Sequence, residues 1–145
     1  MQTTPCRSLL LTLLLSFTAA SVGASEITVK VTGIESAEGI IGCALFAASE
    51  ADSFPSDGAQ SQMSVDPDTG GVTCSFENVE AGRYAVSVSH DLNSNGKVDT
   101  RAFGIPKEPW GVSNGVRPRM RAPKFKEAAF DLAVDEIKEV EVTVK

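Results

Sequence analysis

The residues from Asp91 to Asp99 carry oxygen-bearing side chains at a spacing suited to binding a cation. Asp91, Asn93 and Asn95 stand at the first, third and fifth positions of this segment, Gly96 at the sixth and Asp99 at the ninth. The first part of an EF-hand-type Ca²⁺ loop has this pattern, because glycine permits the sharp turn and alternate side chains converge on the ion. The spacing therefore predicts a Ca²⁺ site.

This ligand set is incomplete, because Ca²⁺ takes roughly six to eight oxygen ligands. The backbone carbonyl of Lys97 adds one ligand, but the twelfth position is Ala102 in place of the usual Glu. We expect water or a distant carboxylate, such as Glu108, to complete the set, and we expect a modest affinity. The alternative is a hairpin tip in which Asn95-Gly96 forms a type I′ turn and binds nothing.

A long turn-rich segment of more than 35 residues separates His90 from Ala128. Structureless loops beyond about 12–15 residues are uncommon in compact domains and are usually functional or disordered. We interpret this one as an ordered functional loop, with a ligand or envelope partner contacting His90, Trp110, Ser113 and Asn114. Two alternatives stay open: His90 is a core-edge side chain bonded to the loop, and Trp110 caps one end of the domain.

The same segment permits a second class of function, a small periplasmic hydrolase or sugar-processing enzyme that uses His90, Asp99 or Glu108. A triad of Ser113, His90 and Asp91 is disfavoured, because neighbouring residues on a strand point to opposite faces. The sequence also contains no Gly-x-Ser-x-Gly motif of the kind that presents a nucleophilic serine. We therefore favour a non-enzymatic binding domain.

The elements that must position these residues follow a two-residue alternation of apolar and polar side chains, which is typical of antiparallel β-structure. The clearest alternating runs are 26–32, 72–77, 83–89 and 139–145, with weaker strands expected at 62–66 and 128–134. Residues 39–47 are apolar on both faces, which predicts a central strand. About seven short strands predict an all-β, antiparallel two-sheet sandwich of immunoglobulin-like or transthyretin-like type.

Two cysteines fall on the apolar phase of their strands. Cys43 alternates with Ile41 and Leu45, and Cys74 with Val72 and Phe76. Both side chains are therefore expected to face the interior, and we predict a disulfide between them. The alternative is a pair of buried thiols that act as small hydrophobic side chains.

The N-terminal residues resemble a secretory signal peptide. Arg7 precedes an apolar run at residues 9–20, and small residues follow, ending at Ala24. The run is too short to cross a bilayer of about 30 Å as a helix, and no second apolar stretch of spanning length follows. We expect residues 1–24 to be removed and residues 25–145 to form a single exported domain, periplasmic or secreted.

The charge of the chain is unevenly distributed. The sequence has 13 basic and 19 acidic residues, a net charge of −6, which argues against a nucleic-acid partner. Residues 26–80 hold ten acidic and one basic residue, whereas residues 81–126 hold nine basic and three acidic ones. The basic section either pairs with the acidic strands or forms a patch for an anionic ligand.

Several strings in this chain together resemble a known bacterial family. They are HDLNSNGKVD at 90–99, FGIPKE at 103–108, GVSN at 111–114, GRYAV at 82–86, FP at 54–55, APKF at 122–125 and AF at 129–130. The combination is similar to the family called domain of unknown function 2141, over essentially all of residues 25–145. The resemblance implies an exported bacterial β-sandwich and assigns no activity. The chain departs from the family pattern at Trp110 and in the arginine-rich stretch 117–121.

Overall fold

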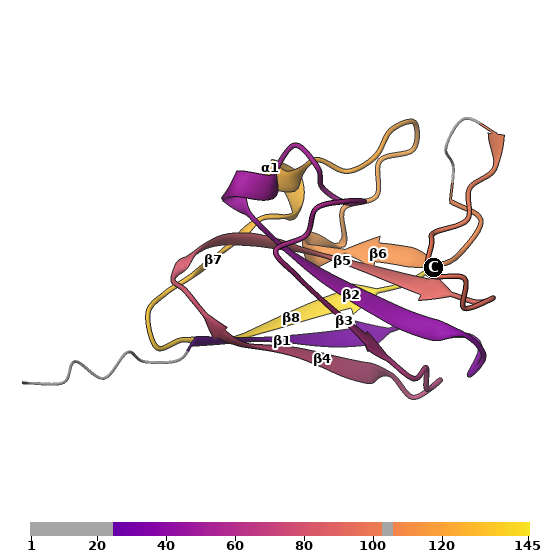
Figure 1. Cartoon of the computed structure of the whole chain (residues 1–145), viewed down its shortest axis with the longest axis horizontal. Coiled ribbons are helices and arrows are strands. Elements are labelled where there is room, and N and C mark those ends of the chain that lie inside the picture. Colours follow the sequence, from indigo (N-terminus) through magenta and orange to yellow (C-terminus); the bar gives the residue numbers. More distant parts are fainter. Residues whose placement is uncertain (1–24, 103–105) are drawn as a thin grey trace, which may run out of the picture.

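The computed structural model describes residues 25–102 and 106–145, which form two facing β-sheets with loops gathered along one side (Figure 1). The predicted signal peptide, residues 1–24, lies outside the described residues. No helix among the described residues is both long and apolar enough to cross a membrane.

The first sheet has three strands in the order β4-β1-β8. These are β1 (Ser25–Thr32), β4 (Val72–Val79) and β8 (Ile137–Thr143). Strand β1 pairs with β4 antiparallel and with β8 parallel, so that Val29 lies opposite Cys74 on one side and Val140 on the other. Alternate residues of β1 (Ile27, Val29 and Val31) are buried, as the period-two pattern predicts.

The second sheet is wholly antiparallel and has the order β3-β2-β5-β6, with β7 pairing to the start of β5. Its strands are β2 (Ile40–Ala47), β3 (Ser61–Val65), β5 (Gly82–Asp91), β6 (Trp110–Val112) and β7 (Phe130–Leu132). The inward residues of both sheets form one main apolar core between them.

These two sheets confirm the predicted all-β sandwich, with eight strands where about seven were expected. The additional strand is β6, inside the segment that sequence analysis treated as a loop. Three residues are too few to show an alternation pattern. Strand β6 also needs Gly111, because a Cβ there would lie 2.4 Å from the backbone oxygen of Thr143. The sheets therefore meet closely at β6 and β8.

A disulfide joins the two sheets, as predicted. Cys43 on β2 and Cys74 on β4 are both buried, and their Cα atoms are 6.5 Å apart. The bond closes a chain segment with a sequence separation of 31 residues. Strands β2 and β4 belong to different sheets and do not pair with each other, so the disulfide is a covalent link between the sheets.

A smaller apolar cluster supports the long segment after β6. Phe54 packs edge-to-face against Phe46 and Phe125, with ring centres 5.2 and 6.1 Å apart. This cluster lies under three short helical turns, η1 (Ala48–Glu50), η3 (Ser113–Gly115) and α1 (Phe125–Ala128). The segment is thus held by a core of its own rather than lying free on the surface.

Candidate functional site

The loop from Asp91 to Asp99 begins directly at the end of β5 and wraps around the Asp91 carboxylate. Asp91 Oδ1 accepts a hydrogen bond from the backbone N–H of Asn95 (3.2 Å), and Oδ2 accepts one from Gly96 (2.7 Å). The Asp91 residue is only 8% exposed. A carboxylate that binds two N–H groups of the following turn fixes the path of that turn.

The backbone of this turn differs from the bare hairpin tip considered above. A type I′ turn requires positive φ at both central residues. Positive φ occurs at Ser94 (55°) and Gly96 (77°), and Asn95 is not in that conformation. The alternative of a type I′ turn at Asn95-Gly96 is therefore wrong.

The side chains of Asn93, Asn95 and Asp99 converge, as their spacing predicts. Asn93 Nδ2 donates to Asp99 Oδ2 (2.9 Å), and Asn95 Nδ2 donates to Asp99 Oδ1 (3.2 Å). The amide oxygens accept backbone hydrogen bonds instead, Asn93 Oδ1 from Asn95 and Asn95 Oδ1 from Lys97. In this arrangement amide hydrogens face the carboxylate.

Glu108 closes the base of the loop. Its Oε1 accepts a hydrogen bond from the backbone N–H of Leu92 (3.0 Å), and its Oε2 accepts one from Asp99 (2.9 Å). The Glu108 residue is 7% exposed. The carboxylate therefore bridges the two ends of the loop through backbone N–H groups. Its expected role as a further cation ligand stays a prediction.

These carboxylates are satisfied by N–H groups rather than by cationic side chains. The ion pairs within residues 25–102 and 106–145 are Lys30–Glu139, Arg83–Asp131, Arg121–Glu127 and Lys138–Glu136. None of them includes Asp91, Asp99 or Glu108. Within the same described residues, no three His, Cys, Asp or Glu side chains are grouped so that they alone would hold a metal ion. A cation here would also need amide and backbone oxygens or water.

His90 is a core-edge residue, as one alternative considered above expected, but its ring bonds to the segment before β2 and not to the loop after β5. Its ring Nε2 lies 2.7 Å from the backbone oxygen of Glu38, and its backbone N–H donates to Pro109. The residue is 1% exposed. The segment before β2 packs closely here, because a Cβ at Gly39 would lie 2.1 Å from the Asp91 carbonyl oxygen. His90 therefore presents no side-chain atoms for a ligand.

Ser113 and Asn114 connect η3 to α1 rather than facing the loop at residues 91–99. The Ser113 hydroxyl donates to the carbonyl of Ala128 (2.7 Å) and accepts from the N–H of Val86 (2.9 Å). Ser113 is fully buried, so the structure does not place it on a ligand-binding surface. The exposed Asn114 donates to the carbonyl oxygens of Glu127 and Ala129. Neither residue belongs to the carboxylate loop.

Trp110 is half-buried and is covered by Arg117, a partner that sequence analysis missed. The Arg117 guanidinium lies over the indole, 4.4 Å from its ring centre. The Arg117 Nη1 donates to the carbonyl oxygen of Trp110 (2.9 Å), and Nη2 donates to that of Lys145. Partial burial lowers the pKa of Arg117 from its ordinary value. One face of the indole is therefore occupied by the protein's own side chain.

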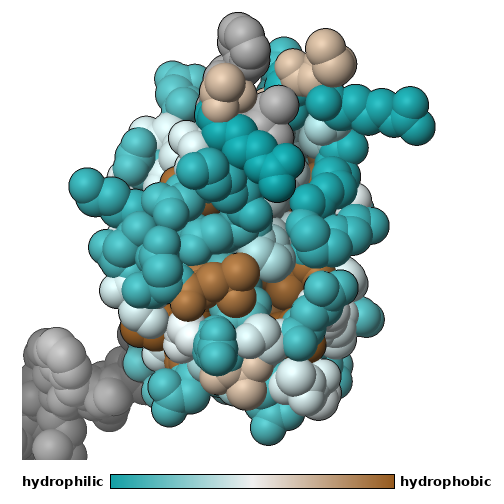
Figure 2. Space-filling view, turned by 90° about the vertical axis from the view of Figure 1, so that its right-hand side faces the viewer, coloured by the Kyte–Doolittle hydropathy of each residue, from teal (hydrophilic) through white to brown (hydrophobic). Residues whose placement is uncertain are grey.

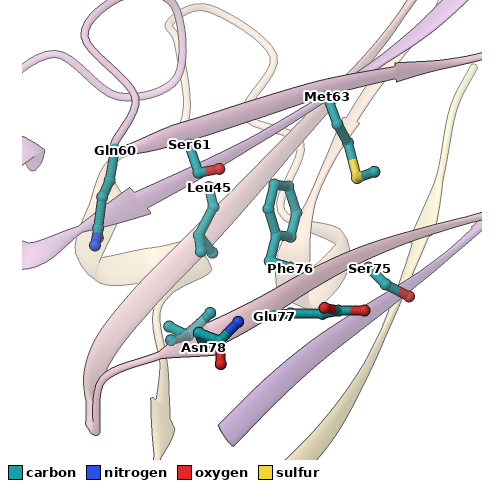
Figure 3. A pocket seen from close by; sticks show the side chains of 9 residues that line it. Leu45, Gln60, Ser61, Met63, Ser75, Phe76, Glu77 and Asn78 are labelled. Carbon is teal, nitrogen blue, oxygen red and sulfur yellow. The ribbon is translucent and has the colours of Figure 1, made fainter. Parts of the chain in front are cut away.

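A separate hollow of about 280 Å³ lies between the edge strands β3 and β4 (Figure 3). Leu45 and Phe76 project into it, with Met63 at one end and Asn78 at the other. None of the residues predicted to form the site lines this hollow. It marks the open edge of the sandwich, where the two sheets are not joined.

The comparisons with known proteins agree with the resemblance seen in the sequence. The family model described as "Uncharacterized protein conserved in bacteria (DUF2141)" matches residues 29–140. No curated protein and no solved structure shows a significant match to the chain.

Proposed function

From the premise that the chain belongs to this bacterial family, DUF2141, we propose that it is an exported, non-enzymatic binding domain. In this proposal its loop at residues 91–99 is organised by Ca²⁺. Asp91, Asn93, Asn95 and Asp99 supply side-chain oxygens, and Lys97 supplies its carbonyl. Glu108 closes the set, and the segment that follows it meets a ligand or partner.

The contacts of Asp99 with two asparagine amides, together with two further carboxylates bonded to the backbone of the same loop, support this proposal. The Asp91 and Glu108 carboxylates are nearly buried, and Asp99 receives both amide groups. Gathering carboxylates has an electrostatic cost that a hard cation offsets. The side-chain amide of asparagine has both a donor and an acceptor end. A half-turn of the Asn93 and Asn95 amide groups would therefore direct their oxygens toward an ion beside Asp99.

Export is supported by the disulfide and by the N-terminal sequence. Disulfides persist in oxidising compartments such as the periplasm, and Cys43 and Cys74 form one across the sandwich. Together with the signal-like residues 1–24, this bond supports a periplasmic or secreted location.

The non-enzymatic part of the proposal is supported by the environment of His90. A general base must reach a proton of its substrate, whereas the His90 ring bonds to the Glu38 carbonyl and is buried. Glu108 is likewise engaged by two backbone N–H groups. These engagements of His90 and Glu108 favour the binding role over the hydrolase alternative.

Calorimetric titration with Ca²⁺ tests the cation site. We expect measurable heat, a rise in melting temperature, and a Kd on the order of 10⁻⁴–10⁻³ M, the range of weak extracellular modules. Asp99→Asn should weaken binding by at least tenfold, because it removes one of two loop carboxylates. Asp131→Asn, which removes an exposed carboxylate on β7, is the matched control. The absence of both heat and a melting shift at millimolar Ca²⁺ would refute the site.

A further inference from the structure

The loop between η3 and α1 presents an isolated apolar residue at its tip. Met120 is 95% exposed and stands between Arg119 and Arg121. Exposed single apolar residues are common on proteins, but this one lies on a loop whose two sides are both anchored. The contacts that hold this loop therefore determine where Met120 lies.

Two arginines bond this loop to the rest of the domain, one on each side of Met120. On one side Arg117 bonds to the carbonyl oxygens of Trp110 and Lys145. On the other side Arg121 forms a bidentate pair with Glu127, with distances of 2.9 and 2.7 Å. The pairing with Arg121 lowers the pKa of the Glu127 carboxyl to about 2, so the anchor is charged at neutral pH. Met120 therefore lies between two residues that are each bonded to the rest of the domain.

The surface around this tip is positively charged. Residues 92–126 hold eight basic and two acidic residues, and both acidic ones, Asp99 and Glu108, accept hydrogen bonds within their own loop. Arg121 is the one of these eight that forms an ion pair within the described residues, and the cations close to Met120 in the sequence that form none include Arg119, Lys124 and Lys126. The loops that follow β5 and η3 rise on the same side of the molecule (Figure 1), and hydrophilic side chains cover that side in the end view (Figure 2).

We propose that the loop at residues 117–126 docks onto an anionic phospholipid bilayer, with Met120 entering the boundary between headgroups and acyl chains. Arg119, Lys124 and Lys126 would contact lipid phosphates. An exposed apolar residue flanked by arginines in a basic segment suits such a surface, because buried apolar area and attraction to anionic lipids both contribute to interfacial binding. A soluble polyanion would contact the cations but would gain no binding energy from the exposed apolar side chain of Met120.

The acidity of the rest of the chain orients the molecule for this contact. Charges more than about 8 Å away are largely screened at physiological ionic strength, so the acidic strands do not cancel the local attraction. The acidic strands instead repel an anionic surface that approaches the side on which they lie. The proposal names the partner of the binding role given above. It does not depend on Ca²⁺, because Met120 and its neighbouring cations lie outside residues 91–99.

Vesicle co-sedimentation in EDTA tests the proposal separately from Ca²⁺ binding, because EDTA removes free Ca²⁺. The exported protein, with its N-terminus established by mass spectrometry, should sediment with vesicles that contain phosphatidylglycerol and should stay in solution with pure phosphatidylcholine. Met120→Gln should lower the partition coefficient about tenfold, because it removes an apolar side chain from the interface. Arg119→Gln should lower it about fivefold, the effect expected for one surface cation.

Matched variants outside residues 117–126 serve as controls. Val134→Gln removes another exposed apolar residue, which is 71% exposed, and Arg83→Gln removes another exposed arginine. Neither should change partitioning. Failure of the wild-type protein to sediment with anionic vesicles would overturn the proposal. So would vesicle binding that Arg119→Gln weakens and Met120→Gln leaves intact, because it would indicate purely electrostatic attraction to phosphate groups without insertion of Met120. Binding that survives both substitutions would belong to another part of the chain and would also overturn it.

Discussion

Glu108 accepts a hydrogen bond at 2.9 Å from the backbone N–H of Asp99, nine residues earlier in the chain. The second oxygen of the same carboxylate accepts the N–H of Leu92. One buried side chain therefore ties together both ends of the loop that carries the candidate cation ligands. This arrangement makes the loop's order depend on a residue outside it.

Glu108→Gln should loosen the loop and lower the free energy of unfolding by about 1–3 kcal/mol. The substituted amide keeps one acceptor oxygen and turns an NH₂ group toward a backbone N–H, which leaves a buried donor unsatisfied. Hydrogen exchange at Leu92 and Asp99 should accelerate more than exchange in β2. Glu77→Gln, at an exposed carboxylate on β4, is the control. Unchanged protection at both amides would show that Glu108 does not hold the loop.

Gly111→Ala should destabilise the fold by about 1–3 kcal/mol, the usual cost of forcing an extra group into a packed site. The added Cβ would lie 2.4 Å from the Thr143 carbonyl oxygen, where β6 and β8 meet. Gly42→Ala offers a comparison, because its Cβ would meet only the Ser89 side-chain oxygen at 3.2 Å. Urea denaturation of the two variants measures the difference. Equal stabilities would contradict the close approach of the strands.

Removal of the disulfide by the paired substitution Cys43→Ala and Cys74→Ala should cost about 3–4 kcal/mol. The estimate follows from the loop entropy released in the unfolded chain when a bond spanning 31 residues is lost. Thermal denaturation with and without reductant should show a lower midpoint for the reduced wild-type protein. Mass spectrometry of the non-reduced, alkylated protein provides an independent check, and two alkylated thiols in the exported form would contradict the bond.

The ion pair between Glu127 and Arg121 should give a distinct acid transition. Hydrogen bonds from Arg121 and from the backbone of Lys124 lower the Glu127 pKa from 4.5 to about 2. Because the folded pKa is the lower one, the stabilisation is present above the ordinary carboxyl pKa and is lost as pH falls from about 4.5 to about 2. NMR titration of the Glu127 carboxyl carbon should show this midpoint. A midpoint near 4.5 would mean that the pair is open in solution.

The sequence predicted the sandwich well because its long strands show the alternation of a half-buried sheet. The run from Ile27 to Val31 is an example, and each apolar residue in it is buried. The contacts of Asn93 and Asn95 with Asp99 could likewise be predicted, since local spacing determines which side chains a tight loop brings together. These features depend on neighbours within about ten positions.

Features that depend on distant packing could not be predicted in this way. Ser113 was expected at the surface, yet its hydroxyl bonds to Val86 and Ala128 inside the domain. A short irregular turn carries no periodic signal that would mark a buried serine. The stacking of Arg117 on Trp110 was missed for a similar reason, because the turn through η3 that separates the two residues has no regular period.

The parallel pairing of β1 with β8 has a mechanical consequence. Their seven paired positions run from Glu26 opposite Ile137 to Thr32 opposite Thr143. The described chain therefore enters this pair at one end and leaves it at the other (Figure 1). Tension applied between the two ends would pull the strands along their length and strain all their interstrand hydrogen bonds together. Such a shear geometry resists extension better than one in which bonds open in succession, so the domain is built to stay folded when it is pulled from both ends.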